Sequence, residues 1–353
     1  MPGSLAAIVK YALAALLLAL IPVLRAQACG PDPSYYLSDI ALSPDASLTY
    51  VTDEVNGKVW VISLADHRTV RSGAIDGAPQ AIVLTRDGSE ALVATSFGPI
   101  IAIDAKTLKP RLTLAAGKDI RALDLSADGK VVYTVASKEG TNSVMALERK
   151  TGALIFERPI GGWSWNIRVS PSSKVYVTTM MPKRAGSAIE VIDGETGKFL
   201  KRLPLPDSGR DIEFSADGAV GYVSIYGGIR NRGQIIRFDA RRDILGDGIR
   251  MRGTLSDLAV LPGSGAVYAL DDAPDLTTTV AVIAPDLSRV LSRTAIDPAQ
   301  KIVMPTRSGS KVHVLTGLTD NQRILTLDAP AQKPVPVVPL EMAGHEVGTC
   351  GVS

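Results

Sequence analysis

The chain has 353 residues, of which 46% are hydrophobic, 5% aromatic and 21% charged. Its 38 basic and 36 acidic residues give a formal net charge of +2, and this excess resides in Lys10 and Arg25. The composition excludes a disordered chain, and the neutral remainder disfavours general binding to nucleic-acid phosphates.

Residues 1–28 have the three parts of a secretory signal peptide. Lys10 precedes an apolar run from Tyr11 to Leu24, and the small-residue site Ala26-Gln27-Ala28 follows. The run of 14 residues is shorter than the roughly 20 that a membrane-spanning helix needs. We therefore expect no membrane span. Cleavage and export would place a mature chain, 29–353, in the periplasm or outside the cell.

The two cysteines, Cys29 and Cys350, lie at opposite ends of the predicted mature chain. In an oxidising compartment such a pair indicates a disulfide. Closing so long a loop would restrict the unfolded state by roughly 5 kcal/mol. The alternative is a lipid anchor on Cys29, but the cleavage signal of bacterial lipoproteins usually has leucine where this chain has Ala26. The disulfide is the preferred interpretation.

A short turn motif recurs every 41 to 46 residues along the mature chain. Copies such as Thr85-Arg86-Asp87-Gly88 and Ser126-Ala127-Asp128-Gly129 contain residue types that suit tight turns. The motif begins at Ser43, Thr85, Ser126, Ser170, Ser215, Leu261 and Thr306. A β-branched or aromatic run of strand length follows each copy. These runs are centred on Tyr50, Leu92, Tyr133, Tyr176, Tyr222, Tyr268 and His313.

Four short strands in each unit of about 44 residues, repeated seven times, predict an all-β fold. We expect a seven-bladed β-propeller of four-stranded antiparallel blades, preceded by a cleaved signal peptide. The blades should start near residues 37, 79, 120, 164, 209, 255 and 300, and a tail should occupy 341–353. A disulfide between Cys29 and Cys350 would then clasp the seam between the first and last blades.

The run Tyr50-Val51-Thr52-Asp53 nearly reproduces the Tyr-Val-Thr-Asn core of the YVTN-repeat (YncE-like) β-propellers. The chain resembles that family from Leu37 to about Leu340. The resemblance implies a propeller fold and a secreted or periplasmic location, and many members of the family have no established activity. Because the related superfamily includes lactonases and quinoprotein subunits, the resemblance also implies that enzymatic relatives exist.

In propellers of this connectivity the innermost strand of each blade follows the central channel and ends at the turn motif. Period-two alternation places the residues two and four positions before the motif on the channel, and the residue five positions before it at the channel mouth. The residues predicted to bind a ligand are Asp39, Arg121, Asp124, Trp165, Asn166, Arg168, Arg210, Asp211, Glu213, Asp257 and Lys301, with Arg230 from a loop on the same face. No cofactor is predicted. A cation in the channel is one way to relieve its excess of carboxylates.

Two interpretations of these charged residues stay open. As struts between blades they would satisfy one another's hydrogen bonds. As a site at the channel mouth they would hold a small molecule or a protein partner. Loops on that face add Arg232 to a basic side, and Asp271 and Asp272 to an acidic side.

Motifs for catalysis and metal binding are missing from the sequence. His67, His313 and His345 are too far apart in sequence for a metal-ligand motif, and there is no haem-attachment, Walker or nucleophile-elbow motif. The leading hypothesis is therefore a binding protein without catalysis and without a metal. The alternative is a lactonase-like hydrolase or lyase that uses Arg210, Asp211 and Glu213.

Overall fold

Every regular element of the described chain is a β-strand, as the β-branched and aromatic runs predict. The computed structural model describes residues 37–138, 141–180, 186–227, 232–273, 277–296, 299–305, 309–316 and 323–329. All of them belong to one unit, Tyr35–His345, and a second unit, Met1–Ser34 with Glu346–Ser353, contains none of them. The predicted signal peptide, Cys29, Cys350, the tail and Arg230 therefore lie outside the described residues.

The strands form antiparallel sheets in which neighbours in sequence are neighbours in space. The first strands of the sheets are β1 (Leu37–Leu42), β5 (Pro79–Leu84), β9 (Leu123–Leu125), β13 (Trp163–Val169), β17 (Gly209–Phe214), β21 (Thr254–Val260) and β25 (Ala299–Pro305). The second strands are β2 (Leu48–Asp53), β6 (Glu90–Thr95), β10 (Val131–Lys138), β14 (Lys174–Met180), β18 (Val220–Ile225), β22 (Val267–Asp272) and β26 (Lys311–Thr316). The third strands are β3 (Lys58–Ser63), β7 (Ile100–Asp104), β11 (Thr141–Glu148), β15 (Ser187–Asp193), β19 (Gln234–Asp239), β23 (Thr278–Ile283) and β27 (Arg323–Asp328). The fourth strands are β4 (Thr69–Ala74), β8 (Pro110–Leu114), β12 (Leu154–Ile160), β16 (Phe199–Leu205), β20 (Ile244–Arg250) and β24 (Val290–Ile296).

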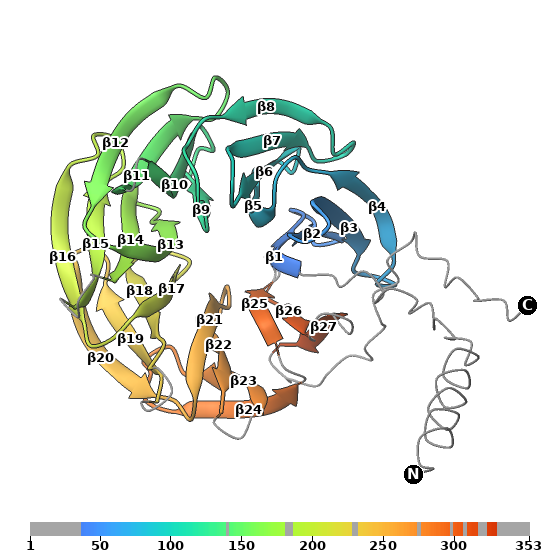
Figure 1. The fold of residues 1–353 in the computed structure, drawn as a ribbon. Coiled ribbons are helices and arrows are strands. Elements are labelled where there is room, and N and C mark those ends of the chain that lie inside the picture. The colour runs from blue at the N-terminus through green and yellow to red at the C-terminus, as the bar shows by residue number, and fades with distance from the viewer. Residues whose placement is uncertain are drawn as a thin grey trace, which may run out of the picture. The chain divides into compact units, whose positions relative to one another are not determined.

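The sheets stand around a central axis as the blades of a propeller, with the first strands nearest the axis and the fourth strands outermost (Figure 1). Six sheets have four strands, and the sheet of β25, β26 and β27 has three in the part of the chain that the structure describes. The prediction of four-stranded antiparallel blades is thus confirmed for six blades. The fourth run of the last repeat falls after Ala329, outside the described residues.

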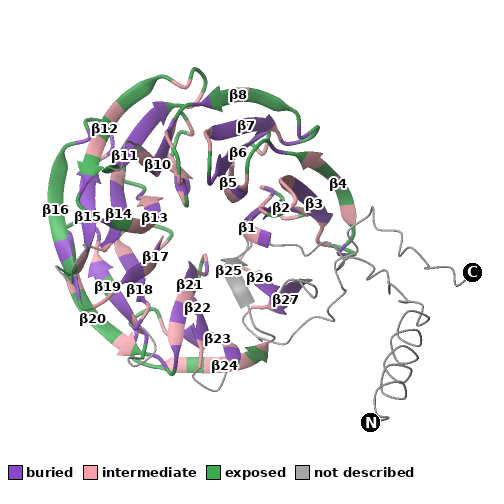
Figure 2. Cartoon of the chain, viewed as in Figure 1, coloured by how far each residue is buried: buried purple, intermediate pink, exposed green. Residues whose placement is uncertain are grey.

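The hydrophobic core lies between neighbouring sheets. Each sheet contributes to one apolar cluster with the sheet before it and to another with the sheet after it. β25 lies next to β1, and Leu37, Trp60 and Leu315 share the cluster at this seam. Figure 2 shows that burial is concentrated in the inner three strands, whereas the outer strands β4, β8, β12 and β16 are largely exposed. Ring closure among the described residues therefore rests on apolar packing.

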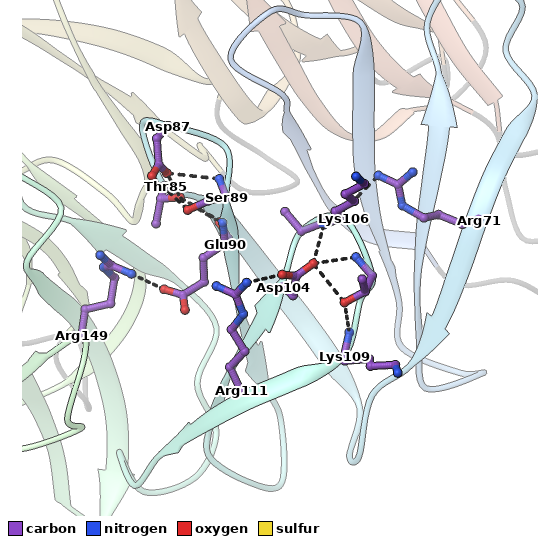
Figure 3. Close-up of polar contacts among 12 residues, drawn as sticks. Arg71, Thr85, Asp87, Ser89, Glu90, Asp104, Lys106, Lys109, Arg111 and Arg149 are labelled. Carbon is purple, nitrogen blue, oxygen red and sulfur yellow. Dashed lines mark hydrogen bonds and ion pairs between the residues drawn. The ribbon is translucent and has the colours of Figure 1, made fainter.

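The recurring turn motif is held by a bond between its first and third residues. In the second blade Thr85 donates a hydrogen bond to Asp87 (2.6 Å), and Ser89 donates to the same carboxylate (Figure 3). The hydroxyl of Thr85 lowers the pKa of Asp87 to about 2, with further help from Ser89. The same first-to-third bond recurs at Ser43 with Asp45, Ser126 with Asp128 and Ser215 with Asp217. These bonds are the physical basis of the sequence repeat.

Polar side chains also join one blade to the next. Glu90, which is buried, pairs with Arg149 of the third blade, and Figure 3 shows this pair beside the Asp104–Arg111 pair within the second blade. The tyrosine at the centre of a second strand donates a hydrogen bond to a carbonyl oxygen in the turn between the third and fourth strands of the next blade. These bonds join Tyr50 to Ala105 (3.0 Å), Tyr133 to Gly194 (2.9 Å), Tyr176 to Ala240 (2.9 Å) and Tyr222 to Pro285 (2.7 Å).

His313 occupies the tyrosine position of the last sheet, as the repeat alignment predicts. It is 2% exposed, its Nδ1 bonds Thr326 (2.9 Å), and its Nε2 is buried with no hydrogen-bond partner in the described chain. The interpretation of His313 as a core residue is therefore confirmed. The seam has a histidine where four other blade junctions have a tyrosine hydroxyl bonded to the next blade.

Replacing His313 with glutamine should make the protein less sensitive to acid. Burial lowers the pKa of His313 to about 4, and Lys311 and His67 add to this effect. In the unfolded chain this histidine takes up a proton near pH 6.5. The contribution of the neutral side chain to the free energy of unfolding is therefore full above pH 6.5. It is lost as the pH falls toward 4, by an amount on the order of 2 kcal/mol. Thermal melts between pH 8 and pH 4 test this, because the wild-type Tm should fall more steeply than that of the variant. Parallel curves would contradict it.

Candidate functional site

A cavity of about 480 Å³ follows the axis of the propeller. Its described wall is formed mainly by the first strands of six blades. It includes these residues predicted to bind a ligand: Asp39, Arg121, Asp124, Trp165, Asn166, Arg168, Arg210, Asp211, Glu213 and Asp257. Lys301 lies in β25, but the structure does not describe its side chain, and Arg230 lies outside the described residues. The repeat alignment therefore brings ten of the twelve residues together, and their binding of a ligand stays a prediction.

A β-bulge near the start of several first strands turns the polar side chains toward the axis. The pairing register shifts between Leu37 and Asp39, Ser164 and Ile167, Gly209 and Ile212, and Leu255 and Leu258. A hydroxyl from the second strand caps the backbone at the bulge, as when Ser224 accepts from the amide of Asp211 (3.0 Å). Bulges redirect side chains in this way. The repeat thus places a polar group on the channel in successive blades.

Several channel carboxylates bond the backbone of the next blade. In each case an aspartate of one first strand accepts a hydrogen bond from a main-chain amide of the following first strand. The pairs are Asp39 with Ile82 (2.9 Å), Asp124 with Val169 (2.8 Å) and Asp211 with Leu258 (3.0 Å). These three aspartates are therefore struts between blades, which supports one of the two interpretations drawn from the sequence.

Asp211 accepts more hydrogen bonds than Asp39 or Asp124. Its Oδ1 also accepts from the side-chain amide of Asn166 (2.6 Å) and from the amide of Ile212 (2.9 Å), and its side chain is 4% exposed. Arg168 of the preceding blade approaches the same oxygen at 3.7 Å. Because both oxygens of Asp211 already accept hydrogen bonds, this carboxylate is poorly suited to abstract a proton from a substrate.

Below the mouth, one guanidinium serves three carboxylates. Arg168 donates to Glu213 Oε1 from Nε (3.1 Å) and Nη2 (2.9 Å). Burial opposes the charged form of Arg168, but Glu213, Asp211 and Asp124 outweigh it and raise its pKa. Burial raises the pKa of Glu213 to about 7 and also raises the pKa of Asp124. Burial therefore favours the protonated forms of these two carboxylates.

Replacing Glu213 with glutamine should raise the Tm at pH 8 relative to wild type and have little effect at pH 5. The folded protein holds a proton on Glu213 up to about pH 7, whereas the unfolded chain releases it near pH 4.5. Wild-type stability therefore falls as the pH rises through this window. The uncharged variant lacks that loss, so its advantage at pH 8 should be about 2 to 4 °C. An equal Tm difference at both pH values would contradict the raised pKa.

The mouth of the channel carries a stack of cationic and aromatic side chains. The guanidinium of Arg210 lies 3.9 Å from the ring centroid of Trp165 and 4.4 Å from that of Tyr226. Arg121 lies 5.2 Å from the same indole. Tyr226 belongs to this end of the blade because it follows β18, whose last residue, Ile225, pairs with Gly209 at the start of β17. Two arginines from neighbouring parts of the ring therefore share one tryptophan.

Arg210 makes no hydrogen bond and no ion pair within the described chain, and its Nε is buried without a partner. Burial lowers the pKa of Arg210, and the charge of Arg121 adds to this effect. Trp165 Nε1 and Ser256 Oγ are also buried without a partner among the described residues. Unpaired buried donors are costly, so an acceptor that entered here would satisfy groups that the protein leaves unpaired.

The opposite side of the mouth is occupied by a bonded network around Glu54. This carboxylate accepts hydrogen bonds from Gln80 (3.0 Å), Ser38 (3.3 Å) and Ser96 (3.3 Å). The acidic side predicted from loop residues is wrong for Asp271, which is 1% exposed and accepts from the amide of Gly253 (2.8 Å). Arg232 is exposed, and its place on the basic side of the mouth stays a prediction. The mouth is therefore cationic near Trp165 and bonded internally near Glu54.

Sequence patterns missed Tyr226 and Glu54. Each lies just beyond the end of a second strand, so neither follows the alternation from which the channel residues were predicted. Both residues directly follow the last residue of a second strand, beside the start of the first strand. A search at this position of each repeat could have identified them.

No group of three His, Cys, Asp or Glu side chains within the described ranges is arranged to hold a metal ion. The residues that come closest to a cation site are Asp124, Asp211 and Glu213, and Arg168 already sits among them. The suggestion of a cation in the channel stays a prediction.

The chain is similar to proteins of known structure along most of its length. It matches a hydrazine synthase structure from Kuenenia stuttgartiensis with a TM-score of 0.73 and 13% identity, covering 87% of this chain and 99% of that one. It matches the dihydro-heme d1 dehydrogenase NirN, solved in complex with DHE, with a TM-score of 0.63 and 17% identity, covering 86% of this chain and 66% of that one. No curated protein has detectable similarity to the chain. At these identities the structural likeness shows the propeller fold alone.

A family model described as outer membrane protein assembly factor BamB matches residues 44–228. This propeller family is related to the YVTN-repeat family but different from it, so the finer assignment suggested by Tyr50-Val51-Thr52-Asp53 is not confirmed. Because the match spans more than half of the 353 residues, the chain belongs to the family of the outer membrane protein assembly factor BamB.

Proposed function

We propose that this chain is an exported, non-catalytic binding protein that holds a small ligand with an anionic group at the mouth of its central channel. The observation that carries the proposal is the guanidinium of Arg210, stacked on Trp165 and Tyr226 without any ion-pair partner in the described chain. Stacking on two rings fixes the guanidinium before a ligand arrives, so little entropy is lost on binding. A cavity of about 480 Å³ is within the range of small-molecule sites.

Export is supported by the predicted signal peptide and by the family, whose description names an outer membrane protein assembly factor. Among the described residues no helix is both long enough and apolar enough to cross a membrane. The family description also favours a protein partner. A partner that presents a carboxylate to Arg210 and Arg121 would use the same face and the same chemistry.

A second candidate function is catalysis by Glu213. A carboxyl group with a pKa of about 7 beside an arginine has the properties of a general base or acid at neutral pH. Arg210 and Glu213 both line the cavity, whereas Asp211 is committed to bonds between blades. A lactonase-like hydrolase or lyase would therefore depend on Arg210 and Glu213 and would lose Asp211 as its third catalytic residue.

Replacing Arg210 with glutamine should weaken the binding of small anions by about tenfold or more, because a charge-assisted hydrogen bond is lost. Isothermal titration with hexanoate, benzoate and inorganic phosphate measures the effect. Arg241→Gln is the matched control, since Arg241 is 75% exposed and lies on the far side of its blade from the channel wall. Equal affinities for wild type and Arg210→Gln would overturn the proposal. Turnover of a lactone or ester panel that disappears in Glu213→Gln would favour the enzyme.

A further inference from the structure

We propose that the ligand is a zwitterion: its carboxylate lies against Arg210 and Arg121 at the mouth, and its ammonium group reaches Glu213 deeper in the channel. This inference rests on the proposed function of the mouth. The cationic stack alone does not define the class of ligand. The charge of the cavity lining changes from positive at the mouth to negative deeper in the channel, and this change indicates a ligand with both charges.

The deeper part of the cavity is negatively charged. Asp124, Asp211 and Glu213 share the single guanidinium of Arg168, and all of these residues line the cavity. Asp124 and Asp211 use both of their carboxylate oxygens on protein donors. Glu213 uses only Oε1, on Arg168, and its side chain is 28% exposed. Glu213 is therefore the carboxylate in this group with an oxygen left for a ligand.

Asn166 adds a second, independent acceptor. Its side-chain nitrogen donates to Asp211 (2.6 Å), and this bond fixes the orientation of the amide. Its Oδ1 then has no hydrogen-bond partner among the described residues. The residue is 9% exposed, and it lines the cavity. An unpaired buried acceptor calls for a donor. An ammonium group has three donors and no acceptor, so its chemistry suits both this oxygen and the free oxygen of Glu213.

The three carboxylates around Arg168 favour a positive group as well. Burial is the main cause that raises the pKa of Glu213, and the charges of Asp211 and Asp124 add to it, so three carboxylates lie close together around one guanidinium. A cation of the ligand would supply the missing charge, whereas a simple anion would be repelled below the mouth. An anion at Arg210 and a cation at Glu213 therefore complement the cavity in both of its parts.

The two ends of the ligand should be several bonds apart. Arg210 and Glu213 lie three residues apart on β17, across the bulge between Gly209 and Ile212, which corresponds to roughly 7 to 10 Å along the strand. An α-amino acid carries its two charges within one residue and cannot reach both groups. An ω-amino carboxylate of about six carbons, or a short peptide with free ends, has the required reach.

Calorimetric titration of the full-length protein with 6-aminohexanoate, hexanoate and hexylamine tests the inference. We expect 6-aminohexanoate to bind at least tenfold more tightly than hexanoate, because the ammonium group adds charge-assisted hydrogen bonds. Glu213→Gln should remove this advantage, and Arg210→Gln should weaken the binding of 6-aminohexanoate and of hexanoate. The comparison of the three probes on the wild-type protein does not depend on the folding of any variant.

The possible outcomes separate the two proposals. Equal affinities for 6-aminohexanoate and hexanoate, both lost in Arg210→Gln, would overturn the zwitterion and keep the anion site. Binding of 6-aminohexanoate that is insensitive to Glu213→Gln would also overturn it. If neither carboxylate binds and hexylamine does, the proposed function itself fails, because the mouth then takes no anion.

Discussion

Replacing Asp211 with alanine is expected to lower the free energy of unfolding by about 3 to 5 kcal/mol, since a buried, bonded charge is removed from among its partners. The substitution leaves the amide of Leu258 and the side-chain amide of Asn166 without their acceptor. It also takes one carboxylate away from Arg168. Three consecutive blades, which contribute β13, β17 and β21, therefore lose a shared contact. Chemical denaturation of the variant measures the loss.

The control for this prediction is Asp247→Ala. Asp247 is exposed on β20 and should change the free energy of unfolding by less than about 0.5 kcal/mol. Asp211→Asn should lie between the two, because asparagine retains one acceptor oxygen in the same volume. A stable Asp211→Ala protein that has lost ligand binding would show that the carboxylate belongs to the site and that the strut interpretation is wrong.

Replacing Gly221 with alanine is expected to lower the free energy of unfolding by about 3 kcal/mol through overpacking in the fifth blade. A methyl group on Gly221 would lie 2.0 Å from one carbon of the Phe238 ring and 2.4 Å from two others. Phe238 is 1% exposed and contacts the rings of Tyr176 (5.5 Å) and Phe214 (5.9 Å), so it has no room to move. The loss should appear as a lower denaturation midpoint and a lower Tm.

The reason for this glycine is visible in the pairing of the second and third strands. Gly221 lies opposite Phe238 in the register, and at the equivalent pair of the fourth blade Val175 lies opposite Ile192. A larger residue on one strand is thus matched by a smaller one on its neighbour. Gly246→Ala in the exposed β20 of the same blade is the control, because its nearest non-neighbouring atom is 3.2 Å away. Similar Tm values for the two variants would contradict the packing argument.

The repeat made most of the fold predictable from the sequence. Turn chemistry at Ser43, Thr85 and their equivalents depends on residues two positions apart, so a local pattern predicts the turn. Alternation along each first strand likewise depends on neighbours in sequence, which is why ten channel residues were found. For the last repeat the prediction is tested over three strands, because its fourth run falls outside the described residues.

The roles of the channel residues could not be predicted in the same way. Asp211 and Glu213 look alike in the sequence, but one is fully bonded and the other has an oxygen left for a ligand. The difference comes from backbone amides and side chains of other blades, about 45 residues away along the chain. Asp271 was expected in a loop on the acidic side of the mouth, yet it lies within β22 and is buried where it accepts from the backbone of Gly253. Such partners are set by tertiary structure.

The bonds between aspartates and the following blade give the ring a polarity. Each such joint has its acceptor on one sheet and its donor on the next, as in Asp39 with Ile82 and Asp211 with Leu258. This is a head-to-tail contact, and a series of head-to-tail contacts closes when the rotation from one unit to the next divides the circle. The aspartate–amide bonds between blades therefore do not depend on the number of blades in the ring. Duplication of a blade would preserve every joint and alter only the angle between them, so a fold of this kind can change its size without inventing a new interface.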